Sequence, residues 1–261
     1  MPRPHRRKTR ETAAVIRDLI TQLTTARMAE ISTGDAPDDL ATKIMTTADP
    51  LTGERFATDE MVDQVAIFFL AGHETSASAL AWALYLLALY PAWQDKVAAE
   101  AEAAFAGQGP AFAHMSRLGT TRDVFRETLR LYPPVPMMVR EASRPETFRK
   151  RAVRKGSQIV LSPWHLHRHE RLWDAPDAFD PGRYATENGK ACMRSAYMPF
   201  STAQRVCTGA GFAMIEGVLL LAMLVRAYRF ETVPTRPAIP VAHLTVRGKD
   251  GIWLKITPRA G

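Results

Sequence analysis

The chain has 261 residues, of which 46% are hydrophobic, so it can bury the core of one large domain or two small ones. Its net charge of +7 suits an acidic protein, a nucleic acid or an anionic lipid, and does not choose among them. Basic and aromatic residues do not alternate, so no nucleic-acid partner is expected. Two cysteines exclude a disulfide framework and favour a reducing compartment, so we expect a cytoplasmic protein.

The first half of the sequence predicts three helices. Apolar residues at helical spacing predict the first over Thr9–Glu30. The second is expected at about residues 59–89, because Thr58 and two acidic residues are a typical helix start and Pro91 stops it. His73 and Glu74 interrupt its apolar run, so we interpret it as a buried helix and expect no membrane span. The third is predicted over Ala92–Ala106.

The second half is more irregular. A short helix is cut off by Pro133 and Pro134, and the pattern is strand-like from Val139 to Leu166. Residues 168–200 show little periodicity, and a final helix is predicted over about 210–228. The tail, residues 243–256, predicts a hairpin that turns at Lys249–Gly251.

Cys207 lies just before the final helix, where free N–H groups and the helix dipole favour a thiolate. Gly209 leaves room for a flat ligand, and Arg205 offers a positive charge to a carboxylate. The alternative is a cysteine packed as a small hydrophobe. A phosphatase-type cysteine nucleophile would need an arginine six residues later, where this chain has Ala213. A structural zinc site would need more than two cysteines. A haem-iron thiolate fits these residues.

The stretch Ala71–Ala77, "AGHETSA", breaks the apolar run of the long helix. Gly72 costs that helix about 1 kcal/mol relative to alanine. Two tiny residues, Ala71 and Gly72, beside the Glu74 carboxyl and the Thr75 hydroxyl give room for a small ligand and a route for protons. The alternative is a solvated polar patch, or a Thr75 hydroxyl bonded to its own helix.

Two further groups allow weaker interpretations. Glu127 and Arg130 are three residues apart, which alone indicates an ordinary surface ion pair. His165, His167 and His169 would share one face of a strand, which keeps a histidine-metal hydrolase open as an alternative.

Taken in order, the motifs resemble the cytochrome P450 family of haem-thiolate monooxygenases. "AGHETS" is similar to the family's oxygen-activation motif and "ETLR" to its Glu-x-x-Arg helix. "FDPGRY", Phe179–Tyr184, and "FSTAQRVCTG", Phe200–Gly209, are similar to its Phe-x-Pro-x-Arg-aromatic element and haem loop. The match begins partway through the family pattern. We therefore expect a cytochrome P450 fold that lacks its N-terminal half, mainly α with small β-sheets (α+β). The expected single domain spans residues 1–261, with the long central helix at about 59–89, meander and haem loop at about 168–209, and final helix at about 210–228.

The resemblance implies haem b as cofactor and assigns a role to each matched residue. Cys207 would be the axial ligand of the iron. The other haem contacts would be Phe200, Gly209, Ala71 and Gly72, with Arg205, Arg140 and His167 at the propionates. Glu74 and Thr75 would handle oxygen binding and proton delivery. Glu127, Arg130 and Arg183 would form a buried structural ion network.

The implied reaction inserts one atom of O2 into a small organic substrate, which residues 135–138 would approach. Electrons would come indirectly from NAD(P)H through a ferredoxin or flavodoxin-type donor. Without an N-terminal half, the distal haem face and the apolar side of the long helix would be exposed, to be covered by that half or by an oligomer. The alternative is a truncated, non-catalytic haem-binding or interaction protein. Ala203 replaces a glycine of the family's haem loop, which costs roughly 1–2 kcal/mol if the position needs a positive φ.

Overall fold

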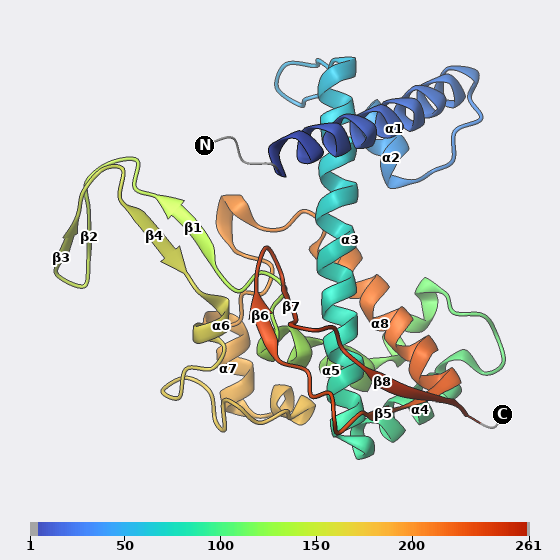
Figure 1. Ribbon diagram of the computed structural model, residues 1–261, viewed down its shortest axis with the longest axis vertical. Helices are drawn as coiled ribbons and strands as arrows, with labels where there is room; N and C mark the ends of the chain where they lie inside the picture. Colours follow the sequence, from blue (N-terminus) through green and yellow to red (C-terminus); the bar gives the residue numbers. More distant parts are fainter. Residues whose placement is uncertain (1–4, 260–261) are drawn as a thin grey trace. The chain divides into compact units, whose positions relative to one another are not determined.

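The computed structural model describes residues 5–259, with the side chains of residues 8–259. These residues form two compact units, one that ends at His73 and one that begins at Glu74 (Figure 1). The boundary falls inside helix α3 (Thr58–Leu89). The helix begins at Thr58 and ends at Leu89, two residues before Pro91, as expected from the sequence.

The first unit contains α1 (His5–Thr33), α2 (Leu40–Thr46) and the first part of α3. Helix α2 was not expected from the sequence, and it begins where the Asp39 carboxylate accepts a hydrogen bond from the Thr42 N–H at 2.9 Å. The same carboxylate binds Arg27 at 2.6 Å, and this hydrogen bond lowers the pKa of Asp39 to about 2. Long stretches of apolar surface on α1 and α3 are exposed in this unit, at Val15, Leu19, Leu23, Ile67, Phe69 and Leu70.

The second unit is built around three mutually packed helices: α4 (Pro91–Phe105), α5 (Gly119–Leu131) and α8 (Ala210–Ala227). Gly217 of α8 permits this packing, because a Cβ there would overlap the ring of Phe125. Among the described helices, α8 is the one long and apolar enough by itself to cross a membrane, and α3 with α4 would pass only as a pair bent by 115°. Val218, Leu221 and Val225 of α8 are fully buried, and 28% of the helix is buried as a whole.

Four antiparallel strand pairs complete the described part of the second unit. They are β1 (Met138–Glu141) with β4 (Gln158–Leu161), β2 (Glu146–Phe148) with β3 (Arg151–Val153), β5 (Tyr228–Thr232) with β8 (Leu254–Pro258), and β6 (Pro240–Ala242) with β7 (Val246–Gly248). The prediction of a hairpin that turns at Lys249–Gly251 was therefore wrong. β7 pairs back to β6, and β8 pairs with the distant β5.

Short helices interrupt the segments that were expected to be strand or irregular. The strand-like run ends at Leu161, because Pro163 begins helix α6 (Pro163–Leu166) and Ser162 caps it. The irregular segment contains α7 (Glu187–Ser195). The remaining helical turns are η1 (Phe112–Arg117), η2 (Pro181–Ala185) and η3 (Ala203–Arg205).

Candidate functional site

A buried ion network lies at the C-terminal end of α5. The Glu127 carboxylate binds Arg130 through two hydrogen bonds of 2.8 Å and Arg183 through one of 2.9 Å. It also accepts the Asp180 N–H at 3.0 Å and the Tyr184 hydroxyl at 3.1 Å. Glu127 and Arg130 are 0% exposed. Burial raises the pKa of Tyr184, and the adjacent Glu127 carboxylate raises it further.

The same two arginines order the irregular segment that follows α6. Arg130 donates to the carbonyl oxygens of His167 and Ala178 at 2.7 and 2.9 Å. Arg183 donates to those of Asp174 and Ala178 at 2.7 and 3.0 Å. Guanidinium groups thus replace the backbone ladder that a helix or strand would supply. This explains how a stretch without hydrophobic periodicity has a fixed structure.

The structure places His167 inside this network, not at a surface where it could meet a carboxylate ligand. Its ring is 0% exposed. Nδ1 lies 3.2 Å from the Arg130 carbonyl oxygen, and Nε2 accepts the Met198 N–H at 2.9 Å. Both ring nitrogens are therefore occupied by backbone groups, which differs from the expected propionate contact. Burial lowers the pKa of His167 to about 4, so the ring is neutral at pH 7.

His167 connects the ion network to the loop that carries Cys207. Met198 lies two residues before Phe200, whose carbonyl oxygen accepts the Cys207 N–H at 2.8 Å. Phe200 packs against the main hydrophobic core, while the Cys207 side chain is exposed. The loop thus has its aromatic residue anchored in the core and its thiol presented outward, three residues before α8.

Arg140 reaches the same loop from β1. Its guanidinium donates to the Ser201 Oγ at 3.0 Å and to the Val139 carbonyl oxygen at 3.0 Å. Arg205 is exposed, and no carboxylate of the described residues forms an ion pair with it. Two cations are thus available on or against the loop that holds Cys207. Ser201 and Ala203 have φ angles of 62° and 55°, so Ala203 does adopt the positive φ at which alanine is strained.

These residues fit the haem that the resemblance implies. A haem needs a soft axial ligand, apolar surface for its macrocycle and cations for its two carboxylates. Cys207 supplies an exposed sulfur, and two apolar side chains near it in the sequence, Val206 and Phe212, are 54% and 64% exposed. A Cβ at Gly209 would lie 3.9 Å from the sulfur, and one at Gly211 would meet no atom within 4 Å. The space beside the thiol is therefore open.

The predicted distal residues divide between the two units. Ala71 and Gly72 end the first unit, so their assignment to a haem contact rests on the sequence motif alone. Glu74 and Thr75 begin the second unit, and both are half-buried. The Thr245 hydroxyl donates to the Glu74 carboxylate at 2.7 Å. Sequence reasoning missed Thr245, because 171 residues separate it from Glu74 and no motif links them.

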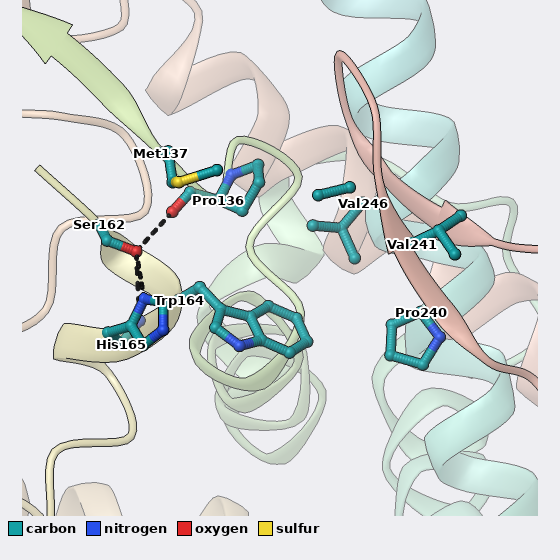
Figure 2. Close-up of a pocket in the computed structure, with 9 residues that line it drawn as sticks. Pro136, Met137, Ser162, Trp164, His165, Pro240, Val241 and Val246 are labelled. Carbon is teal, nitrogen blue, oxygen red and sulfur yellow. Dashed lines mark hydrogen bonds between the residues drawn. The ribbon is translucent and has the colours of Figure 1, made fainter. Parts of the chain in front are cut away.

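A small cavity of about 250 Å³ lies between the segment after α5, the turn of α6 and the β6–β7 hairpin (Figure 2). Its apolar lining includes Met137, Trp164 and Val246. Its polar edge is Ser162, which donates to the Pro136 carbonyl oxygen at 3.1 Å and lies 2.8 Å from His165 Nδ1 (Figure 2). Pro136 and Met137 belong to the segment that was expected to approach a substrate.

The histidine-metal alternative does not survive this geometry. His165 lies on α6 and is exposed, His167 is buried, and His169 is exposed beyond the end of that helix. Within the described part of the chain, no group of three potential metal-ligating side chains is close enough to hold an ion. The three histidines were expected to share a strand face, and Pro163 removes that strand.

Comparisons with known proteins agree with the motifs. The sequence model of the family "Cytochrome P450" matches residues 1–255. Cyclooctatin synthase of Streptomyces melanosporofaciens is 36% identical over 196 residues, which cover 75% of this chain and 43% of that protein. Cytochrome P450 4A11 of Homo sapiens is 37% identical over 208 residues, which cover 78% and 39%. The chain thus spans about two fifths of the length of these curated relatives.

Structural similarity extends over nearly the whole chain. The crystal structure of cytochrome P450DA heme domain superposes with a TM-score of 0.86 at 29% identity, covering 95% of this chain and 54% of that one. The mainly helical architecture with small sheets is therefore the cytochrome P450 fold. With the family model, the relatives and the motifs in agreement, the chain belongs to the cytochrome P450 family, whose members are haem-thiolate monooxygenases.

Proposed function

We propose that this chain provides the haem-binding part of a monooxygenase that inserts one atom of O2 into an apolar organic substrate. The observation that carries the proposal is the exposed thiol of Cys207, presented before α8 by a loop that Phe200 anchors in the core. Electrons would come from NAD(P)H through a separate ferredoxin or flavodoxin-type protein. The unpaired cysteines suit a reducing compartment such as the cytoplasm.

Each residue of the loop has a defined task in this proposal. Haem b, when bound, would supply the iron chemistry that activates O2. Cys207 would hold the iron through its thiolate, three residues before the first residue of α8. Arg140 and Arg205 would bind the haem carboxylates by charge-assisted hydrogen bonds. The bond from Arg140 to Ser201 fixes the guanidinium against the loop in advance.

Glu74 and Thr75 would move protons on the distal side. The hydrogen bond from Thr245 holds one oxygen of the Glu74 carboxylate and leaves the other for a proton. Because Glu74 is half-buried, its carboxylate can exchange that proton with solvent. Thr75, the next residue of α3, brings a hydroxyl group to the same region.

The cavity beside Met137 would hold one apolar end of the substrate. At about 250 Å³ it is below the range of roughly 300–1,000 Å³ that encloses a whole drug-sized ligand. Its apolar lining favours a hydrocarbon group, and Ser162 and His165 offer polar atoms at the edge. The substrate class that fits is therefore a largely apolar molecule.

The test is an absorption difference spectrum of the full chain, supplied with haem, reduced and exposed to carbon monoxide. A strongly red-shifted Soret band that is lost in Cys207→Ser supports the thiolate site. Cys192→Ser is the matched control, since this thiol is buried and bonded to the Leu172 carbonyl oxygen, and it should keep the band. A band typical of histidine ligation, or no haem uptake, would contradict the proposal. Turnover with a supplied reductase then distinguishes an enzyme from a non-catalytic haem-binding protein.

A further inference from the structure

The β2–β3 hairpin and its flanks form the most basic segment of the described chain. Residues 144–155, "RPETFRKRAVRK", hold six of the 34 Lys and Arg residues and one of the 27 Asp and Glu residues. We define the basic hairpin as Arg149, Lys150, Arg151, Arg154 and Lys155, all of which are exposed. The single carboxylate, Glu146, pairs with Arg144 at 2.8 Å and neutralises none of these five.

No carboxylate of the described residues forms an ion pair with the basic hairpin. The salt bridges of the second unit lie elsewhere, apart from the Arg144–Glu146 pair. Five cations within seven residues repel one another, and nothing in the described chain compensates for that repulsion. Such an arrangement is stabilised when an anionic surface approaches it.

The turn of the hairpin carries two cations where the backbone favours other residues. Arg149 and Lys150 have φ angles of 46° and 68°, both in the left-handed region. Two-residue turns of this kind favour Asn-Gly, because long side chains at positive φ cost roughly 1–2 kcal/mol each. The chain thus places its longest cationic side chains at the tip despite a conformational penalty.

An exposed aromatic residue lies among these cations. Phe148 is 52% exposed and pairs across the hairpin with Arg151, so the two side chains share one face. The adjoining β1–β4 pair exposes a second apolar site, Val139 opposite Val160, at 55% and 56%. Figure 1 shows the β2–β3 hairpin extending beyond the end of the β1–β4 pair. Both features therefore lie on one projecting arm.

We propose that the basic hairpin docks the chain on the surface of an anionic phospholipid bilayer. Lysine and arginine near such a surface each attract its phosphate groups, and an aromatic ring next to them inserts at the headgroup level. The long side chains can reach the phosphates while their methylene groups lie against the lipid. This contact is peripheral and requires no membrane-spanning helix.

A lipid surface fits the hairpin better than an acidic protein does. A stable protein interface buries about 800 Å² on each partner, usually over a broad complementary patch. The basic hairpin is instead a narrow two-stranded arm with three residues in each strand. Arg149, Lys150 and Arg151 lie at its tip, and Arg154 and Lys155 follow the end of β3. A continuous anionic plane can contact such a tip in many orientations, whereas a protein partner needs one defined geometry.

The test is cosedimentation of the full chain with vesicles of equimolar phosphatidylcholine and phosphatidylglycerol, and with vesicles of phosphatidylcholine alone. We expect binding only to the anionic vesicles, weakening as salt is raised. The double variant Arg149→Asn, Lys150→Gly removes two charges and supplies the residues that the turn favours, so it should fold at least as well. Its affinity for anionic vesicles should be on the order of 30-fold lower at low salt.

A matched control removes two exposed charges elsewhere in the same unit, Arg247→Gln with Lys249→Gln, and should bind almost as the natural chain does.

Phe148→Ser should weaken binding on the order of 10-fold with an unchanged salt dependence. Equal loss in the two double variants would mean that net charge alone drives binding and would overturn the proposal. Binding to polyglutamate without binding to anionic vesicles would overturn it in favour of an acidic protein.

Discussion

Ala203 adopts a conformation that alanine disfavours, at φ 55° in the loop that presents Cys207. Glycine reaches this region without a Cβ penalty, so Ala203→Gly should stabilise the fold by about 1 kcal/mol. For a domain of this size that corresponds to a rise in Tm of about 2–4 °C. Because the strain lies in the candidate haem loop, affinity for haem should rise as well. Thermal unfolding and haem titration measure the two effects.

Ala106 gives the control for this prediction. It ends α4 at φ 45°, in a left-handed cap remote from the loop in sequence. Ala106→Gly should therefore raise Tm by a similar amount and leave haem affinity unchanged. A lower Tm for Ala203→Gly, or equal gains in haem affinity for both variants, would contradict the argument.

His167 makes stability depend on pH in a defined window. Its folded pKa of about 4 lies below the ordinary value of 6.5, so the folded state holds the neutral ring. The stability from neutral His167 is fully present above pH 6.5 and is lost as pH falls through that value towards 4. Up to about 3 kcal/mol is involved, at 1.36 kcal/mol per pKa unit. Urea unfolding at several pH values should show that the free energy of unfolding falls less steeply below pH 6.5 in His167→Gln than in the natural chain. Parallel curves for the two proteins would contradict this assignment.

At the scale of elements, the ion network behind α5 should behave unlike the surface ion pairs. Glu127→Gln leaves Arg130 and Arg183 buried beside a neutral group, which should cost about 3–5 kcal/mol. Glu187→Gln breaks an exposed pair with Lys190 at 2.9 Å and should cost less than about 1 kcal/mol. Denaturant unfolding of both variants measures the difference. Equal costs would mean that the network is no more than another ion pair.

The elements also show what the sequence could predict. Local signals fix α3, because Asp59 and Glu60 start it and Pro91 stops it. The ion network was expected from the family resemblance, since its residues alone indicate only a surface pair. The partner of β8 was missed because β5 lies more than twenty residues away, while Lys249–Gly251 offers a plausible local turn. His167 was misassigned for a related reason, since its two partners come from α5 and from Met198.

At the scale of the whole molecule, the two units differ in how much core they contain. Within the described part of the first unit, the buried hydrophobic residues are Ile20, Met45, Met61 and Val62. The second unit holds the three hydrophobic clusters and the ion network. Local stability follows buried apolar contact, so unfolding of the full chain should not be a single two-state event.

Amide hydrogen exchange on the full chain tests this difference. We expect the amides of α1 to open at a free energy at least about 2 kcal/mol below those of α8, which is the contribution of roughly one buried Leu or Val side chain. Uniform protection along α1 and α8 would show one cooperative unit instead. Apart from Ala71 and Gly72, every candidate haem residue lies in the second unit. Haem binding should therefore raise protection first in α8 and the Phe200–Gly209 loop, because a ligand that binds only the folded site stabilises the residues that form it.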